Sequence, residues 1–308
     1  MALVSPIQPP AQSSSEHLVY LPDLFSSIMA VKPTLSPHYH DAKAEADSWI
    51  QRTLHADDNW AAKNSRVNFA YMSSIWAPTC DKDEFDEGHL SHDPAAQQQE
   101  LDRTMAIMEG TRSRVSRDED ELGYVFQSAW DRVKERSSEV TQQRYRDMHR
   151  GFFDGILKQV EHIHEQRVFT RNVDEYMDMR RRTIGVHPVI VLCECVLGIH
   201  IPSNVVTHPS LEELGELSAD LVMLVNDLVS YKKDLEQGVD HNLIVLLTAR
   251  GLSRQQAVDE IGSMLDARYR RWYAVLADMP IWGEEIDRQV IRYSEICRNI
   301  ALGSLYWR

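Results

Sequence analysis

Three oxygen-bearing side chains recur at a helical spacing in one short segment of this chain. Asn226, Ser230 and Asp234 stand at positions i, i+4 and i+8. On an α-helix these offsets place the three side chains along one face, about 5–6 Å apart per turn. Amide, hydroxyl and carboxylate oxygens are hard ligands of the kind that Mg²⁺ prefers. The spacing therefore predicts a magnesium-binding face, and the adjacent Lys232 and Lys233 add ammonium groups suited to a diphosphate.

A solvated polar helix face is the alternative interpretation of the same spacing. The polar stripe continues directly from the largely apolar segment 219–225. An apolar stripe at helical spacing belongs to the buried side of a helix. We therefore expect Asn226, Ser230 and Asp234 to line an interior site.

The segment 226–234 resembles the second metal-binding motif of class I terpene synthases, which is written N-D-x-x-S-x-x-K-E. Asp234 stands where Glu is commoner in that family. The resemblance implies that Asn226, Ser230 and Asp234 hold one Mg²⁺, and that Lys233 contacts the substrate diphosphate.

An arginine upstream of this motif extends the resemblance. In the family, an arginine at about this distance reads the diphosphate, and its helix then breaks near a glycine, here Gly185. The guanidinium group offers a fork of donors that suits phosphate oxygens. Successive helical residues point about 100° apart, so Arg180, Arg181 and Arg182 cannot all face one pocket. We assign diphosphate recognition to Arg180 and place the other two on the surface or behind the site.

The end of the sequence resembles the family's last helix, in which an Arg-Tyr pair closes over the diphosphate. Arg308 falls at the position of that arginine, and no tyrosine follows it. The resemblance implies a diphosphate contact for Arg308. Either the native chain extends past Arg308 or the pair is incomplete.

An acidic segment at 81–87 resembles the family's first, aspartate-rich motif, which binds two further Mg²⁺ ions. In the register of the fungal members, Lys82 takes the place of the first aspartate. An ammonium group cannot ligate a metal. This is the main departure of the chain from the family pattern.

Helix geometry limits how the acidic segment can compensate. Asp83 shares a face with Asp86 and Glu87, whereas Asp81 shares a face with Glu84. We predict that Asp83 and Asp86 are metal ligands and that Asp81 substitutes for the missing first aspartate. A motif read from Asp83 to Glu87, and a solvated acidic helix end, stay open.

The apolar spacing along the chain predicts a mostly helical protein. A length of 308 residues suits one large domain or two small ones, and no linker, repeat or low-complexity break divides it. Breaks are expected at Pro- or Gly-containing positions 36–37, 91–94, 187–188, 202–203, 208–209, 251 and 280. We expect a disordered segment over 1–20 and one all-α domain over 21–308, with roughly ten or more helices around a central cavity. The clearest helical segments are 42–54, 68–76, 140–168, 211–234, 242–250, 254–276 and 286–305.

The charge and cysteine content exclude several other classes of protein. A net charge of −14 disfavours binding to nucleic acid and anionic membranes. No apolar run is long enough to cross a membrane. The 4 cysteines suit a reducing compartment, so we expect a cytoplasmic protein. The sequence leaves a homodimer open.

The resemblance implies Mg²⁺-dependent cyclisation of a linear isoprenyl diphosphate, with three Mg²⁺ ions. Loss of diphosphate creates an allylic carbocation, which needs a dry cavity and aromatic faces. Chain length favours farnesyl diphosphate and a sesquiterpene product. Candidate cavity residues, each of which also suits a plain core position, are Trp76, Phe85, Phe153, Tyr176 and Trp307.

Three alternatives remain at this stage. The substrate can be geranyl or geranylgeranyl diphosphate, because cavity volume cannot be read from sequence. A chain-elongating prenyltransferase is disfavoured, because such enzymes carry two aspartate-rich motifs. A diphosphate-binding relative with weak or no turnover is the third, and Lys82 is its main support.

Overall fold

The computed structural model describes residues 18–68, 93–165, 172–239 and 241–307. Every regular element in these ranges is a helix, which confirms the all-α prediction and the expected number of helices. The elements are η2 (Ser27–Met29), α1 (Tyr39–Thr53), α2 (Asp58–Val67), α5 (Pro94–Glu109), α6 (Glu121–Arg136), α7 (Glu139–His164), α8 (Val173–Thr183), α9 (Val186–Leu197), α10 (Ser203–Val206), α11 (Pro209–Gln237), α12 (Leu243–Ala249), α13 (Arg254–Ala277) and α14 (Glu284–Trp307).

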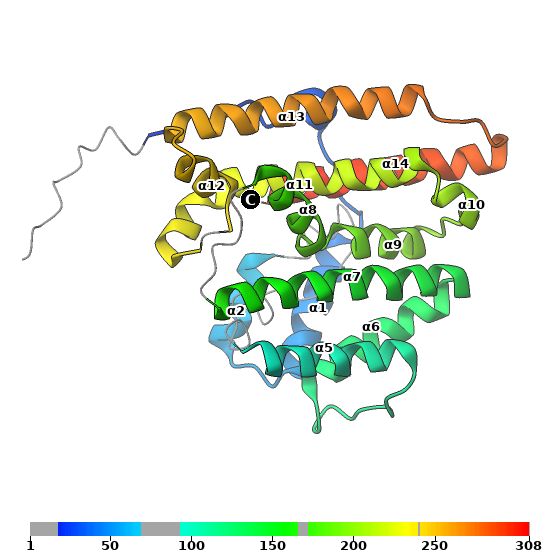
Figure 1. The fold of residues 1–308 in the computed structure, drawn as a ribbon. Coiled ribbons are helices and arrows are strands. Elements are labelled where there is room, and N and C mark those ends of the chain that lie inside the picture. Colours follow the sequence, from blue (N-terminus) through cyan, green and yellow to red (C-terminus); the bar gives the residue numbers. More distant parts are fainter. Residues whose placement is uncertain (1–17, 69–92, 166–171, 240, 308) are drawn as a thin grey trace, which may run out of the picture.

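The helices stack in layers, with α11 near the middle of the molecule. Figure 1 shows α13 along the top, α11 and α14 side by side beneath it, then α9 and α7, and finally α5 and α6. α11 packs against α14, α13, α9, α8 and α12. This position explains why the helix carries buried side chains along most of its length.

α11 begins where its sequence supplies an N-cap. The His208 ring nitrogen Nδ1 accepts from the backbone N–H of Ser210 at 3.2 Å, and Pro209 occupies the first turn. Proline suits that position because its missing N–H has no helical partner there. The predicted helix 211–234 is therefore confirmed and extended to Pro209–Gln237.

The predicted break near Gly185 separates α8 from α9. Gly185 adopts φ of +75°, a left-handed conformation that favours glycine. The break expected at 187–188 is wrong, because His187 and Pro188 lie in the first turn of α9. Proline is tolerated in a first turn because the N–H that it lacks would have no intrahelical acceptor there.

The N-terminal segment packs against the C-terminal helices. Tyr20 donates its backbone N–H to Gln255 on α13 at 2.8 Å, and its carbonyl accepts from the same side chain at 3.0 Å. The ring of Phe25 meets Tyr306 edge-on at 5.3 Å between centroids. Met29 is fully buried in the main core. Of the expected disordered segment 1–20, residues 1–17 lie outside the described ranges.

Two apolar clusters hold the helices together. The larger one surrounds α11 and includes residues of α8, α9 and α12 to α14. The smaller one lies among α5, α6, α7 and α9 and contains Trp130, Tyr145 and Phe153. No helix in the described ranges is long and apolar enough to cross a membrane.

Candidate metal and diphosphate site

The structure brings the three predicted metal ligands of α11 together. Ser230 Oγ donates to Asp234 Oδ2 at 2.6 Å and lies 3.5 Å from Asn226 Oδ1. All three residues are partly exposed, and they continue the face of α11 on which Ala219 and Val222 are buried, seven and four residues before Asn226. The spacing argument thus gives the observed arrangement, an amide, a hydroxyl and a carboxylate within hydrogen-bonding reach.

The chemistry of these donors fits Mg²⁺. Each contributes a hard oxygen, and the Ser230 hydroxyl keeps its oxygen lone pairs because it acts as a donor toward Asp234. Within the described ranges, no group of three or more His, Cys, Asp or Glu side chains is placed to hold a metal. The oxygens of Asn226, Ser230 and Asp234 are the candidate cation site on α11.

Asp227, the neighbour of Asn226, is a fully buried carboxylate that the sequence analysis did not single out. Its Oδ2 accepts from the hydroxyl of Tyr176 at 2.5 Å and from the backbone N–H of Leu243 at 2.9 Å. The Arg180 atom Nη2 lies 3.6 Å from Asp227 Oδ1. Asp227 thus connects α11 to α8 and to the first residue of α12.

Burial sets the electrostatics of this junction. It raises the pKa of Asp227, while the charge of Arg180 and the hydrogen bonds from Tyr176 and Leu243 act in the opposite direction. Burial, together with the Asp227 carboxylate, also raises the pKa of Tyr176 well above its usual value. Tyr176 is therefore a neutral donor, and its role here is a polar contact in addition to the aromatic one predicted.

The three successive arginines point to different partners, as their helical positions predicted. Arg180 faces Asp227 beside the predicted metal ligands, and its side chain is 12% exposed. Arg181 binds both oxygens of buried Asp220, at 2.6 and 3.0 Å, and Arg182 is exposed. Of the three, Arg180 is thus the one beside α11's oxygen-bearing face.

Asn242 is a second residue of this site that the sequence analysis did not assign. Its side-chain oxygen accepts from the backbone N–H of Ile244 and so caps α12. Its nitrogen Nδ2 donates to Asp234 Oδ2 at 2.9 Å and to the carbonyl oxygen of Asp227 at 2.8 Å. The preceding His241 is buried, and burial, aided by the charge of Arg180, lowers its pKa to about 3.

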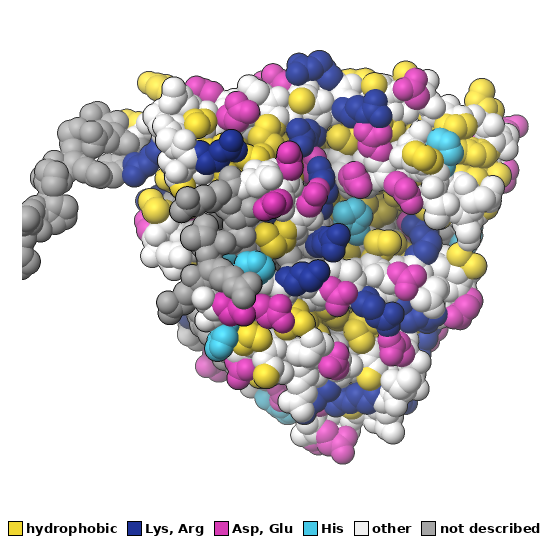
Figure 2. Space-filling model, in the orientation of Figure 1, with side chains coloured by type: hydrophobic (Ala, Val, Ile, Leu, Met, Phe, Trp, Pro, Cys, Tyr) yellow, Lys and Arg dark blue, Asp and Glu magenta, His cyan; other side chains and the backbone are white. Residues whose placement is uncertain are grey.

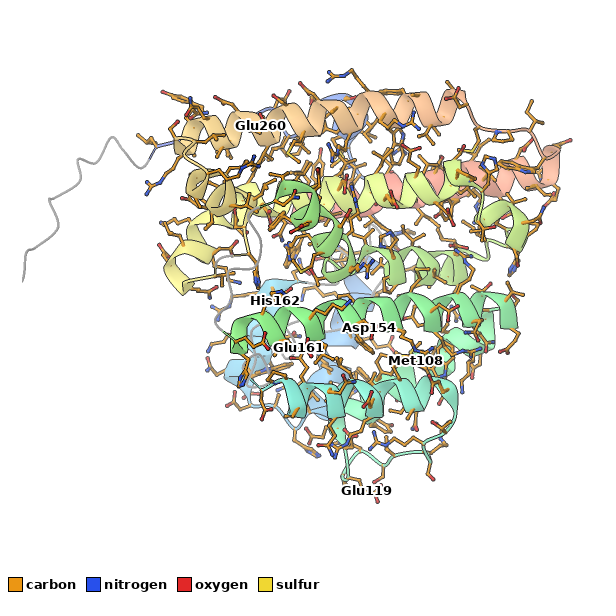
Figure 3. The ribbon with its side chains drawn as sticks, in the orientation of Figure 1. Met108, Glu119, Asp154, Glu161, His162 and Glu260 are labelled. Atoms are coloured by element: carbon orange, nitrogen blue, oxygen red, sulfur yellow. The ribbon has the colours of Figure 1, made fainter. Side chains whose placement is uncertain are left out.

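The end of α7 lies on the same side of the molecule. Figure 3 shows His162 in the last turns of α7, below α8 and α12. Its charge contributes to the lowered pKa of His241. The C-terminal end of α7 thus borders the region where α8, α11 and α12 meet.

The remaining predicted residues are spread over the structure. Lys233 is exposed on α11 beside Asp234. Phe153 is buried in the cluster of α5, α6, α7 and α9, where its ring lies 5.8 Å from that of His149. The Trp307 ring nitrogen Nε1 donates to the Val67 carbonyl at 2.6 Å. The predicted residues that lie outside the described ranges are Trp76, Asp81, Asp83, Phe85, Asp86 and Arg308.

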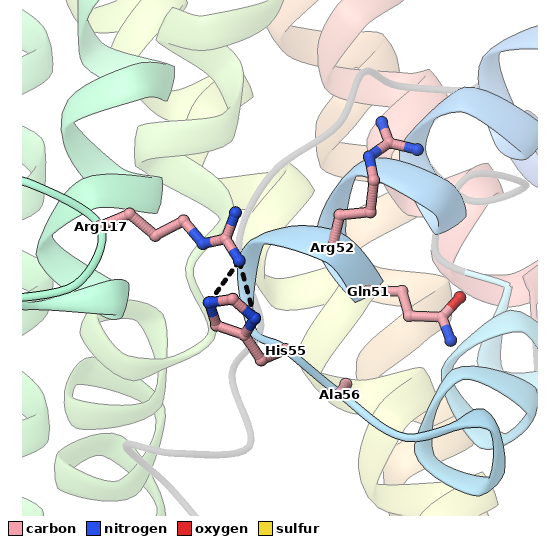
Figure 4. A pocket seen from close by; sticks show the side chains of 5 residues that line it. All are labelled: Gln51, Arg52, His55, Ala56 and Arg117. Atoms are coloured by element: carbon pink, nitrogen blue, oxygen red, sulfur yellow. Dashed lines mark hydrogen bonds between the residues drawn. The ribbon is translucent and has the colours of Figure 1, made fainter.

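Two surface hollows lie apart from these residues. The larger, of about 510 Å³, is lined by Gln51, Arg52, His55, Ala56 and Arg117, and Figure 4 shows Arg117 reaching the His55 ring. No predicted site residue lines it.

The smaller hollow, of about 290 Å³, lies among α8, α11 and α13. Its three arginines pair with carboxylates of α11, Arg181 and Arg268 with Asp220, and Arg271 with Glu213. Figure 2 shows basic and acidic side chains interspersed over the middle of the face of the molecule that it presents.

Comparison with known proteins places the sequence among enzymes of one type. Residues 75–271 match the family model described as terpene synthase family 2, C-terminal metal binding. A (1R,4R,5S)-(-)-guaia-6,10(14)-diene synthase of Fusarium proliferatum is 43% identical, over 94% of this chain and 79% of that protein. A protein of Gibberella fujikuroi with the same identity and coverage is named an inactive form of that synthase.

A solved structure shares the fold. Hedycaryol synthase, solved in complex with HEPES, superposes with a TM-score of 0.75 at 18% identity, over 94% of this chain and 98% of that one. The fold, the oxygen-bearing face of α11 and the relatives at 43% identity agree. The chain belongs to the terpene synthase family.

Proposed function

We propose that this chain ionises and cyclises farnesyl diphosphate to a sesquiterpene and releases diphosphate. The observation that carries the proposal is the set of three oxygens on α11, with Ser230 Oγ 2.6 Å from Asp234 Oδ2, next to the Arg180–Asp227 pair. The product named for the 43% identical relative, a guaiadiene, is a sesquiterpene hydrocarbon. Geranyl and geranylgeranyl diphosphate are the alternative substrates.

We assign the oxygen-bearing side chains to metal binding. Asn226, Ser230 and Asp234 would hold one Mg²⁺, and Asp83 and Asp86, with Asp81 in place of the first aspartate, would hold two more. Bound Mg²⁺ would neutralise the diphosphate and make it a leaving group. The family model's description supports metal binding by this part of the chain.

The protein's own cations would hold the leaving diphosphate. Arg180 offers a planar fork of donors, and its position beside Asn226's neighbour Asp227 fixes it near the oxygen-bearing face. Lys233 adds an ammonium group on the same helix, and Arg308 is assigned a third contact. Trp76, Phe85, Phe153, Tyr176 and Trp307 are the proposed aromatic residues around the hydrocarbon chain.

The proposal includes a cellular compartment and a domain organisation. We place it in the cytoplasm as one α domain over 21–308, with a homodimer left open. The buried thiols Cys193, Cys195 and Cys297 suit a reducing compartment.

The test is incubation with farnesyl diphosphate and Mg²⁺, followed by gas chromatography of the hydrocarbon and measurement of released diphosphate. Asn226→Ala and Ser230→Ala should each lower turnover by about 10²–10³, as removal of one electrostatic group typically does. Both variants should keep the helical circular-dichroism signal. Near-normal turnover in both would contradict the proposal.

A second candidate function is diphosphate binding with little or no turnover. Lys82 at the first position of the aspartate-rich motif favours it, as does a 43% identical relative named as inactive. If Lys82 impairs metal binding, Lys82→Asp should raise activity or Mg²⁺ affinity. If Asp81 has taken over the ligand role, Asp81→Ala should be the damaging change and Lys82→Asp should matter little.

A further inference from the structure

The side chain of Asn242 makes three hydrogen bonds that link two helices. It is fully buried, and its oxygen accepts from the backbone N–H of Ile244 at 2.9 Å. An amide nitrogen carries two N–H donors. Here Nδ2 makes two contacts with α11, one to Asp234 Oδ2 at 2.9 Å and one to the Asp227 carbonyl at 2.8 Å.

Only one of these contacts is needed to cap a helix. The N-cap function of asparagine rests on its oxygen, which accepts an N–H of the first turn. The two Nδ2 contacts run instead to α11, eight and fifteen residues back along the chain. They fix the last turns of α11 relative to the first turn of α12.

The contact with Asp234 constrains a carboxylate that otherwise stands partly exposed. Asp234 Oδ2 receives both the Asn242 N–H, at 2.9 Å, and the Ser230 hydroxyl, at 2.6 Å. Two donors on one oxygen hold the carboxylate in one orientation, and neither engages Oδ1. Donors behind a ligating group orient it and tune its affinity for the metal.

We propose that Asn242 is a positioning residue for Asp234, and that it sets the affinity of the α11 face for Mg²⁺. The inference rests on the proposed function, because it takes Asp234 to be a metal ligand. Asn242 itself contacts neither metal nor substrate in this scheme, and acts by holding the Asp234 carboxylate against Ser230.

The test variant is Asn242→Ser, because serine caps a helix about as well as asparagine but lacks the amide donors. Asn242→Thr is the second variant, which also keeps a capping hydroxyl and lacks the amide donors. The matched control is Ser253→Ala, which removes the N-cap of α13 and its bond to the backbone of Gln256. Each protein is titrated with Mg²⁺ in the presence of inorganic diphosphate, and the melting temperature is followed.

The half-saturating Mg²⁺ concentration should rise about 10-fold or more in the Asn242 variants, as for other groups behind metal ligands. Ser253→Ala should lower the melting temperature at every Mg²⁺ concentration and leave the half-saturation point unchanged. A half-saturation point within about twofold of the unmodified protein in a folded Asn242 variant would overturn the proposal. So would an equal shift in Ser253→Ala.

The same titration separates this inference from the proposed function. If the unmodified protein binds Mg²⁺ and diphosphate but forms no hydrocarbon from farnesyl diphosphate, only the proposed function fails. If the unmodified protein shows no Mg²⁺-dependent change in melting temperature with diphosphate, both fail.

Discussion

At the scale of single residues, Asp227 is a charged side chain whose burial requires compensating groups around it. A fully buried carboxylate is tolerated only with a nearby cation and hydrogen-bond donors, here Arg180, Tyr176 and the N–H of Leu243. Removing it leaves the Arg180 charge, 12% exposed, without that carboxylate.

Asp227→Ala should therefore lower the free energy of unfolding by about 3–5 kcal/mol, the usual cost of breaking a buried ion pair. Chemical denaturation followed by circular dichroism measures it. Asp178→Ala is the control, because Asp178 also pairs with an arginine of α8 but is 73% exposed. A loss below about 1 kcal/mol in Asp227→Ala would mean that the pair is not needed to balance the charge.

Replacement by lysine should affect Arg180 and Arg182 differently. Arg180→Lys keeps the charge but loses the planar fork, so diphosphate binding and turnover should both fall sharply. Arg182→Lys, at an exposed position, should leave both unchanged. Diphosphate titration and turnover of the two variants provide the measurement. A silent Arg180→Lys beside a severe Arg182→Lys would show that the diphosphate is read by a different arginine.

The sequence predicted that Asn226, Ser230 and Asp234 share one face of a helix and that the three arginines point in different directions, because both follow from helical geometry. The assignment of diphosphate recognition to Arg180 came from the resemblance and stays a prediction. The sequence analysis did not single out Asp227 or Asn242. Asp227 lies three residues after Leu224 and seven after Asp220, in the buried stripe of α11. This helical spacing indicates that Asp227 is buried. The contacts of Asn242 with Asp234 depend on how the loop returns to α11, and no local pattern encodes that.

At the scale of helices, α7 carries a buried histidine whose charge state should affect stability. His149 lies among the rings of Phe126, Tyr145 and Phe153. Burial lowers its pKa from 6.5 to about 4. The unfolded chain therefore binds the proton first as the pH falls.

Stability should be at its full value above pH 6.5 and decrease as the pH falls toward 4, by at most about 3 kcal/mol from this residue. His149→Gln should reduce the slope of melting temperature against pH in that window. The exposed His38→Gln should leave the slope unchanged. An identical slope in His149→Gln would mean that other groups, such as His241, account for the acid sensitivity.

The helices that the sequence predicted clearly are those with a continuous apolar stripe, such as α11 and α13. α5 and α6 were not among them. In α5 the buried residues gather toward the C-terminal half, so its apolar periodicity is weak. α6 has a clear apolar periodicity that the sequence analysis did not use. Their start signals were present in the sequence, since Asp93 and Asp120 are N-caps.

At the scale of the whole molecule, the first described residues help to close the main core. Met29 is 0% exposed and lies in the cluster that surrounds α11. Met29→Ala should lower the free energy of unfolding by about 2–5 kcal/mol, as for other large-to-small changes in a core. Denaturation in guanidinium chloride measures the change. The exposed Lys32→Ala serves as the control, and a loss no larger than that of the control would show that the segment contributes little.

The contact between Tyr20 and Gln255 spans 235 residues, and Phe25 meets Tyr306 in the last helix. A ribosome releases the chain from its N-terminus, so Leu24, Ile28 and Met29 leave the exit tunnel long before the helices that cover them exist. During that interval these apolar side chains are open to chaperones and to other nascent chains. α14 must therefore be synthesised before the segment around Leu24 and Met29 can be buried against it.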